Sequence, residues 1–208
     1  MRRRQGFSLI ELLICIGIIG ILMALYLPVL SKARHKAVQV AEKEGLRQHH
    51  LGKVADGANA GTTLTCLPDR EECVEAFRHE VDVGKHEMVV TELRYAVQNE
   101  DEFRAYYHTL INPDNTTPLE YDEFGSLLAR DPDGTTYALR PIDLLTETET
   151  VVLAWTFISS VPAESSSGAL GADVIYTDGH VGFVRYNDAF PAVPTVAILS
   201  HEFMETWQ

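Results

Sequence analysis

The sequence has few basic residues for its size. It contains 17 lysines and arginines against 30 aspartates and glutamates in 208 residues, which gives a formal net charge of −13. Nucleic-acid binding depends on neutralising phosphates with lysine and arginine, so this balance, which is most acidic over residues 54–208, argues against a nucleic acid as a partner of that part of the chain. An acidic surface of this kind fits solubility or cation binding instead.

The chain also lacks internal repeats, low-complexity tracts and recognisable catalytic motifs. Its length leaves room for one ordinary domain and an anchor, but not for two large domains. The His49-His50 pair, His79 and His86 do not have the close spacing of a recognised zinc site. The serines at 165–167 indicate a flexible loop rather than a nucleophile in a strained turn. We therefore expect that the protein is not an enzyme.

Charged side chains are nearly absent from residues 7–30, which read FSLIELLICIGIIGILMALYLPVL. This run of 24 residues is longer than the roughly 20 needed to cross a bilayer. Arg2, Arg3 and Arg4 precede it, and a basic flank of this kind is retained on the cytoplasmic side. The sequence thus predicts one membrane span with the C-terminal part of the chain outside the cytoplasm.

Two simple interpretations of this run are weak. A secretory signal peptide has a shorter apolar region followed by small residues, a rule that Ser31 and Ala33 meet only loosely. A plain single-span anchor explains the length but not Glu11, the one charged residue in the run. A carboxylate inside hydrocarbon costs at least about 2.5 kcal/mol, so Glu11 needs a function.

The N-terminus closely resembles the class III signal of type IV pilins and type II secretion pseudopilins. The resemblance rests on the letters GFSLIE at residues 6–11, after a short basic leader and before the apolar run. It implies that a prepilin peptidase cuts the bond between Gly6 and Phe7 and methylates the new amino group of Phe7. The leader would comprise residues 1–6, and the apolar helix would be kept.

The resemblance also implies how the subunit assembles. The glutamate of the family falls on Glu11, and its helix-bending proline falls on Pro28. In a filament the amino group of Phe7 from a neighbouring subunit would neutralise Glu11. Expected partners are therefore the prepilin peptidase, other pilin or pseudopilin subunits, the assembly platform of a secretion or pilus machine, and the membrane.

Charge divides the rest of the chain into two segments. Residues 31–53 carry six lysines and arginines against two glutamates, a net charge of +4, with apolar residues at helical spacing. Residues 54–208 carry 8 basic and 27 acidic residues, a net charge of −19. We expect the transmembrane helix of residues 7–30 to continue as a helical spine to residue 53, near Gly52 and the Asp56-Gly57 turn signal. Its basic face is either solvated or in contact with anionic lipid headgroups.

The acidic segment is predicted to form a single extracytoplasmic head of α+β class. Residues 137–140, 150–158, 172–177 and 181–186 are rich in β-branched and aromatic residues. Asp178-Gly179 joins the last two and predicts a type I′ hairpin. The resulting small antiparallel sheet should pack on the long N-terminal helix, a pilin-like fold.

Before these strands, the sequence predicts a loop over residues 55–68 and short helices over residues 69–81 and 99–111. Asn99 and Glu102 have the spacing of a capping box at the start of the second helix. Residues 88–97 fit a helix or a strand equally well.

Three cysteines occur in the chain. Cys15 lies in the apolar run, where it packs most simply as a small hydrophobe. Cys66 and Cys73 are six residues apart in a segment that would face an oxidising compartment, so they are candidates for a disulfide. Two free thiols are the alternative.

Two motifs in the head resemble those of known prepilin-like families. Residues 131–137, DPDGTTY, are similar to a stretch leading into the sheet of major pseudopilins, although Asp133 stands where an aromatic is usual. Residues 174–181 are similar to the C-terminal hairpin of the H-X9-DG prepilin-like family, but Gly168 occupies the place of its histidine. No cofactor is expected. Because major pseudopilins bind calcium, Asp131 and Asp133 are the weak candidates for a calcium ion.

Together these observations predict a structural subunit, either a pseudopilin or a minor pilin, that assembles through its N-terminal helix into a type II secretion or type IV pilus-like filament. The resemblance places it in the bacterial inner membrane as a single-pass protein, with its head in the periplasm. The alternative function is a ligand-binding or enzymatic head carried on a pilin-type anchor.

Overall fold

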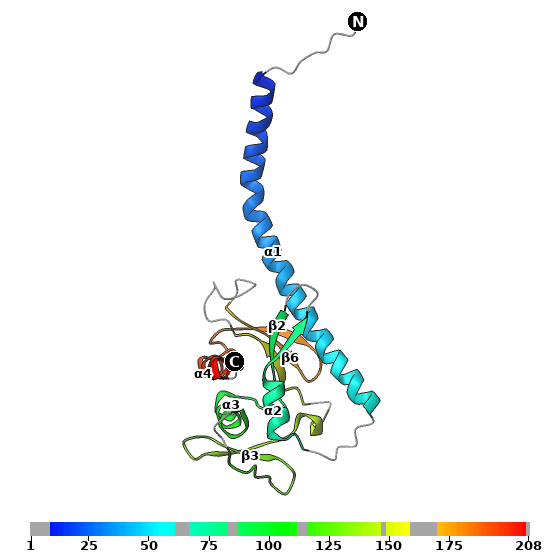
Figure 1. The fold of residues 1–208 in the computed structure, drawn as a ribbon, viewed down its shortest axis with the longest axis vertical. Helices are drawn as coiled ribbons and strands as arrows, with labels where there is room; N and C mark the ends of the chain where they lie inside the picture. The colour runs from blue at the N-terminus through cyan, green and yellow to red at the C-terminus, as the bar shows by residue number, and fades with distance from the viewer. Residues whose placement is uncertain are drawn as a thin grey trace.

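The molecule consists of a long helix and a head that packs against the C-terminal half of that helix (Figure 1). The computed structural model describes residues 9–60, 67–82, 87–111, 116–146, 149–158 and 170–206. The helical elements are α1 (Leu9–Ala60), α2 (Arg70–Phe77), α3 (Glu100–Tyr106), the π-helix η1 (Tyr107–Ile111), the 3-10 helix η2 (Ile142–Leu144) and α4 (Pro194–Thr206). The strands are β1 (His79–Asp82), β2 (Glu87–Glu92), β3 (Leu127–Arg130), β4 (Thr136–Leu139), β5 (Val152–Thr156), β6 (Gly171–Tyr176) and β7 (Val181–Arg185).

Helix α1 is longer than the sequence predicted. It contains 52 residues and is helical to Ala60, which corresponds to about 78 Å at 1.5 Å per residue. The prediction that it ends near Gly52 is wrong, and so is the predicted loop between Ala55 and Ala60. A glycine inside a helix costs only about 1 kcal/mol relative to alanine, so Gly52 and the Asp56-Gly57 pair do not stop a helix that is already formed.

The helix also passes through Pro28 without interruption. Proline removes one backbone hydrogen bond, the one that would reach the carbonyl of Ala24. Figure 1 shows the blue and cyan parts of α1 running in different directions. The helix therefore bends, as a proline predicts, and does not melt locally.

The head contains the predicted antiparallel sheet. Five strands pair in the order β1-β2-β5-β6-β7, and every neighbouring pair is antiparallel. Strands β3 and β4 form a separate two-stranded sheet. The α+β fold class, with a long N-terminal helix and a small antiparallel sheet, is confirmed.

The five-stranded sheet separates two apolar cores. On one face, Leu46 of α1 packs in a small cluster with Met88, Val90, Ala154 and Ile175. The opposite face carries a larger core contributed by α2, α3, η1 and α4, with Trp155 of β5 fully buried in it. The sheet is therefore the middle of three layers, with α1 on one side and α3 and α4 on the other (Figure 1).

The short helices begin as their caps predict. The Asn99 side chain accepts a hydrogen bond from the backbone N–H of Glu102 at 3.0 Å, and the Glu102 carboxylate accepts one from the N–H of Gln98 at 2.8 Å. The helix predicted over residues 69–81 is shorter than expected, because α2 ends at Phe77 and β1 follows. The ambiguous residues 88–97 supply most of strand β2.

The turn between β6 and β7 differs from the predicted type I′. Only Gly179 has a positive φ, of 81°, and Asp178 does not. The N–H of Gly179 donates to the carbonyl of Tyr176 at 2.8 Å, and the N–H of Tyr176 donates to the carbonyl of His180 at 3.1 Å. This pattern is a type I turn followed by a left-handed glycine, the usual three-residue hairpin loop.

Candidate functional site

The N-terminal part of α1 presents an apolar surface to its surroundings. Among the described residues, one helical segment, Leu9–Gly52, contains a stretch apolar enough to cross a membrane, and none of that stretch is buried against the head. Its large side chains are exposed by half or more throughout, from Leu9 at 82% to Leu30 at 66%. Such a surface needs a lipid bilayer or other helices to cover it.

The predicted assembly residues lie at the start of this surface. Glu11 stands in the first turn of α1 and is exposed. A negative charge in this turn is favoured by the positive end of the helix dipole. Gly6 and Phe7, the predicted cleavage and methylation residues, lie outside the described residues.

Charged contacts between α1 and the sheet form a second functional feature, which we call the seam. Its members are Lys43, His49 and His50 of α1, Glu92 of β2, Arg94, and Asp173 of β6. Two of them are acidic side chains with only 4% of their surface exposed, Glu92 and Asp173. Part of the basic face of α1 therefore pairs with carboxylates of the head, although the Lys43 side chain remains 41% exposed.

At one end of the seam, the Nζ atom of Lys43 lies 3.6 Å from Oδ1 of Asp173. That distance is an ion pair but too long for a strong hydrogen bond, and Oδ1 accepts no hydrogen bond from the described residues. Burial raises the pKa of Asp173 to about 6, although Lys43 partly opposes this shift. The carboxylate is thus held in an unfavourable charged state at neutral pH.

At the other end, Nε2 of His49 lies 3.4 Å from one oxygen of Glu92, and Arg94 lies 3.6 Å from the other. The neighbouring His50 lies beside the hairpin turn, where its ring atoms are 3.8 Å from the position that a side chain at Gly179 would take. Burial lowers the pKa of His50; the charge of Glu92 opposes this shift, and His49 adds to it. This end of the seam joins α1 to both β2 and the β6–β7 hairpin.

The sequence gives a signal for the seam that our sequence analysis did not use. Asp173 is the only charged residue in strand β6, GADVIY, and five of the six residues of that strand are buried. A lone carboxylate in such a strand requires a partner, and the basic face of the preceding helix is the natural source.

The candidate calcium residues are held by an arginine. Arg104 donates from Nε to Oδ1 of Asp131 at 2.7 Å and from an Nη atom to Oδ2 at 2.5 Å. These hydrogen bonds lower the pKa of Asp131, which is buried. The Asp133 side chain is 79% exposed, and its carboxylate lies 3.6 Å from the same guanidinium. A calcium ion at Asp131 would have to displace Arg104. The described part of the chain contains no group of three or more histidine, cysteine, aspartate or glutamate side chains that could hold a metal ion.

The predicted cysteine pair is placed only in part. Cys73 lies in α2 and is fully buried, and burial raises the pKa of its thiol to about 12. Cys66 lies outside the described residues, so a disulfide between the two stays a prediction.

The acidic and histidine residues of the hairpin tip serve the turn. The backbone N–H of His180 donates to the Asp178 carboxylate at 3.0 Å, and the His180 ring is 2.6 Å from the same oxygen. The ring also stacks on Tyr176, with centroids 4.1 Å apart. These contacts fix the loop.

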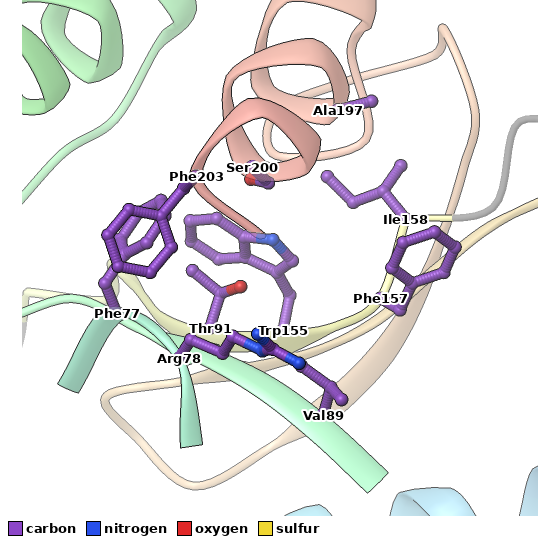
Figure 2. Close-up of a pocket in the computed structure, with 10 residues that line it drawn as sticks. All are labelled: Phe77, Arg78, Val89, Thr91, Trp155, Phe157, Ile158, Ala197, Ser200 and Phe203. Carbon is purple, nitrogen blue, oxygen red and sulfur yellow. The ribbon is translucent and has the colours of Figure 1, made fainter. Parts of the chain in front are cut away.

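The head also contains a small, partly open cleft between α4 and the sheet, with a cavity volume of about 20 Å³, which is room for about one water molecule. Figure 2 shows the indole of Trp155 in the middle of the cleft, with Ser200 of α4 beside it and the Arg78 side chain on the opposite side. The Ser200 hydroxyl is buried and has no hydrogen-bond partner in the described structure. The walls are otherwise mainly apolar, comprising Phe77, Val89, Thr91, Phe157, Ile158, Ala197 and Phe203.

Comparison with known proteins identifies the N-terminal segment. Residues 1–27 match a family model described as the prokaryotic N-terminal methylation motif, the prepilin-type signal. The matched range includes Gly6, Phe7 and Glu11. No curated protein and no solved structure matches the chain. The pilin-like interpretation of the N-terminus is thus confirmed, and the motif implies processing by a prepilin peptidase.

Proposed function

We propose that this chain, which begins with a prepilin-type methylation motif, is a pseudopilin or minor pilin of a type II secretion or type IV pilus-like filament. The peptidase cuts between Gly6 and Phe7 and methylates Phe7. The mature protein is a structural subunit, without catalytic activity or a cofactor of its own. The head lies in the periplasm, and the mature N-terminus stays at the cytoplasmic side of the inner membrane.

The observation that carries this proposal is the continuity between the motif and α1. The motif covers residues 1–27, and the exposed apolar part of a 52-residue helix begins within it. A prepilin-type leader is cut before the apolar run, so the helix stays in the mature subunit, whereas an ordinary signal peptide is removed together with its apolar region. A retained helix with an uncovered apolar surface serves both as an anchor and as an assembly surface.

Glu11 gives the assembly step its specificity. In hydrocarbon its carboxylate is costly whether it is ionised or protonated. The methylated amino group of Phe7 from an adjacent subunit offers a positive charge that compensates it in a low-dielectric setting. Because this pair forms only at one axial offset between neighbours, it also fixes the stagger of subunits in the filament.

The orientation rests on the motif rather than on counting charges. Three arginines precede the apolar run, and Lys32, Arg34 and Lys36 follow it. Basic residues therefore flank both ends of the run, so the positive-inside rule supports the predicted orientation less strongly than the motif does. A prepilin peptidase works on the cytoplasmic side, which places residues 1–6 there.

The seam explains how the head stays in line with the anchor. Lys43 and His49 connect α1 to two different strands of the sheet. The small apolar cluster around Leu46 lies between these two contacts along the helix. The stagger of neighbouring anchors therefore determines the stagger of neighbouring heads.

The test is to express the wild type and Glu11→Val in the native host at equal levels and to isolate filament or pseudopilus material by crosslinking. We expect both proteins to begin at a methylated Phe7 by intact mass and both to be membrane-bound. Only the wild type should be incorporated, because valine removes the charge that a neighbour recognises.

Two matched variants control this test. Ile18→Val changes an apolar residue of the same helix and should assemble normally. Glu11→Asp keeps the charge and should retain part of the assembly. Efficient assembly of Glu11→Val, or a mature chain that does not begin at Phe7, would overturn the proposal.

The cleft beside Trp155 favours the second candidate function, a binding head on a pilin-type anchor. Its apolar walls, the Arg78 guanidinium and the unpartnered Ser200 hydroxyl suit a ligand that inserts one small polar group. A head that acts by binding would keep its activity in a truncated form starting near residue 31, whereas a filament subunit requires Glu11 and the cleavage site.

A further inference from the structure

The stretch between the apolar run and the head carries three basic residues that the head does not use. The apolar run ends at Leu30, and the first partly buried residue of α1 is Val38. Lys32, Arg34 and Lys36 lie between them, and all three are exposed. We call these three residues the collar.

The collar differs from the other basic residues of α1 in its partners. Lys43 and His49 pair with carboxylates of the sheet across the seam. No hydrogen bond or ion pair joins a collar residue to any part of the chain that the structure describes. Figure 1 shows that this part of α1 lies above the head, between the apolar segment and the first contacts with the sheet.

The length of the stretch matches a layer of lipid headgroups. Residues 31–37 span about 10 Å along a helix. The polar layer on one side of a bilayer is roughly 5–8 Å thick, the difference between the full bilayer and its hydrocarbon core divided over two sides. With residues 9–30 in hydrocarbon, the collar therefore stands among the headgroups.

The collar also surrounds the helix. Residues four positions apart lie on one face of a helix, so Lys32 and Lys36 are neighbours, while Arg34 lies on the opposite side. Lipids on either side of the anchor can thus reach a positive charge.

The acidic head is repelled by an anionic membrane, so the anchor needs positive charges at the membrane surface. Residues 54–208 carry a net charge of −19. The described head first covers α1 at Val38, about 10 Å along the helix from the hydrocarbon, close to the Debye length of about 8 Å at physiological salt. Repulsion between the head and negative lipids is then only partly screened, and three positive charges at the surface oppose it.

We propose that the collar of Lys32, Arg34 and Lys36 binds the phosphate groups of anionic lipids where α1 leaves the membrane. The proposal rests on the membrane anchoring proposed above and adds the kind of lipid that the anchor selects. Lysine and arginine near an anionic surface each attract it by about 1 kcal/mol, so three of them suffice for a clear preference.

The test uses the full-length mature chain, residues 7–208, in phosphatidylcholine vesicles that contain a spin-labelled lipid. The fraction of labelled lipid immobilised at the protein is compared for phosphatidylglycerol and phosphatidylcholine labels. We expect at least a threefold preference for phosphatidylglycerol at low salt, falling towards one in 1 M salt. Addition of inorganic phosphate at constant ionic strength should not abolish it, because the collar binds a surface and not a free anion.

The decisive variant replaces all three collar residues with glutamine, and its preference should fall to near one. The matched control, Arg47→Gln with Arg130→Gln and Arg185→Gln, removes three exposed charges from elsewhere and should keep the preference. Equal preference in the collar variant and the wild type would overturn the proposal, as would loss of preference on adding phosphate. Extraction of the wild type from vesicles by alkaline carbonate would contradict the proposed membrane anchoring. A protein that resists extraction but shows no lipid preference would contradict only the role of the collar.

Discussion

The anchor half of α1 and the head bury their apolar side chains in different ways. From Leu9 to Leu30 the large apolar residues are all at least half exposed, whereas Trp155 and Phe103 in the head are fully buried. The head therefore contains its own core, while the anchor obtains burial only from lipid or from neighbouring copies. We therefore expect a core substitution in the head to lower the stability of the fold. A substitution in the anchor should instead affect processing, membrane insertion or assembly.

The seam is where these two regions meet, and it uses charge as well as apolar contact. The cluster around Leu46 is small, and two nearly buried carboxylates stand beside it. A buried charge is costly unless it is paired, so the seam adds little to the stability of the fold. Its main effect is to fix where the head sits along α1. This suits a subunit whose head must sit at one height on its helix.

The largest expected effect comes from the processing site. Gly6→Leu should abolish cleavage, because a side chain at this position obstructs the close fit of the backbone in the peptidase. The precursor should accumulate in the membrane, since the apolar run is unchanged. Immunoblotting and intact mass of the membrane fraction measure this outcome.

Gly20→Leu is the matched control for Gly6→Leu. A side chain at Gly20 meets nothing within 4 Å, so processing should be normal. Normal maturation of Gly6→Leu would show that cleavage occurs elsewhere and would remove the main support for the distinction between anchor and head.

The next largest effect concerns the core of the head. Trp155→Ala should lower the free energy of unfolding of the head by about 3–5 kcal/mol. The indole packs against Phe103 and Phe190, with ring centroids 5.8 and 6.0 Å apart. Denaturant unfolding of the full-length protein in detergent, followed by near-UV circular dichroism, measures the change.

Leu22→Ala makes a similar truncation in the anchor, where the side chain is 51% exposed. It should change the unfolding of the head by less than about 0.5 kcal/mol, as surface substitutions do. A large loss of head stability in Leu22→Ala would contradict the separation of the two regions.

The smallest expected effect is at the seam and depends on pH. The folded pKa of Asp173, about 6, is above its value in an unfolded chain. The folded state therefore binds a proton more tightly, and stability from this group is present at low pH and lost as pH rises through 6. Asp173→Asn removes the buried charge and should stabilise the protein at pH 8 by about 3 kcal/mol.

Thermal melts between pH 4.5 and pH 8 check this dependence. The gain from Asp173→Asn should shrink as the pH falls, since the wild-type carboxylate becomes protonated. Asp188→Asn, which changes an exposed aspartate, should show no such trend. A destabilised Asp173→Asn at pH 8 would mean that the ion pair with Lys43 outweighs the cost of burial.

Local signals in the head predicted local structure well. Asn99 and Glu102 marked the start of α3, and the β-rich runs marked β4 to β7, each to within two residues at either end. These signals work because a cap or a two-face alternation is decided within a few neighbouring residues. Strands β1 and β3 and helix α4 could not be predicted in this way, because their short or mixed patterns acquire their structure from the strands and helices they pack against.

The anchor could be predicted from the sequence, because GFSLIE, the basic leader and the 24 residues with a single charge together form one signal within the first 30 residues. Only the tertiary structure decided how far α1 runs and which of its basic residues meet the head. It turned Lys43 and His49 towards buried carboxylates of the sheet, and it left Lys32, Arg34 and Lys36 exposed. A membrane span depends only on the hydrophobicity of consecutive residues, so it can be predicted from the sequence. A packed interface brings together residues as distant in sequence as Lys43 and Asp173, so it cannot.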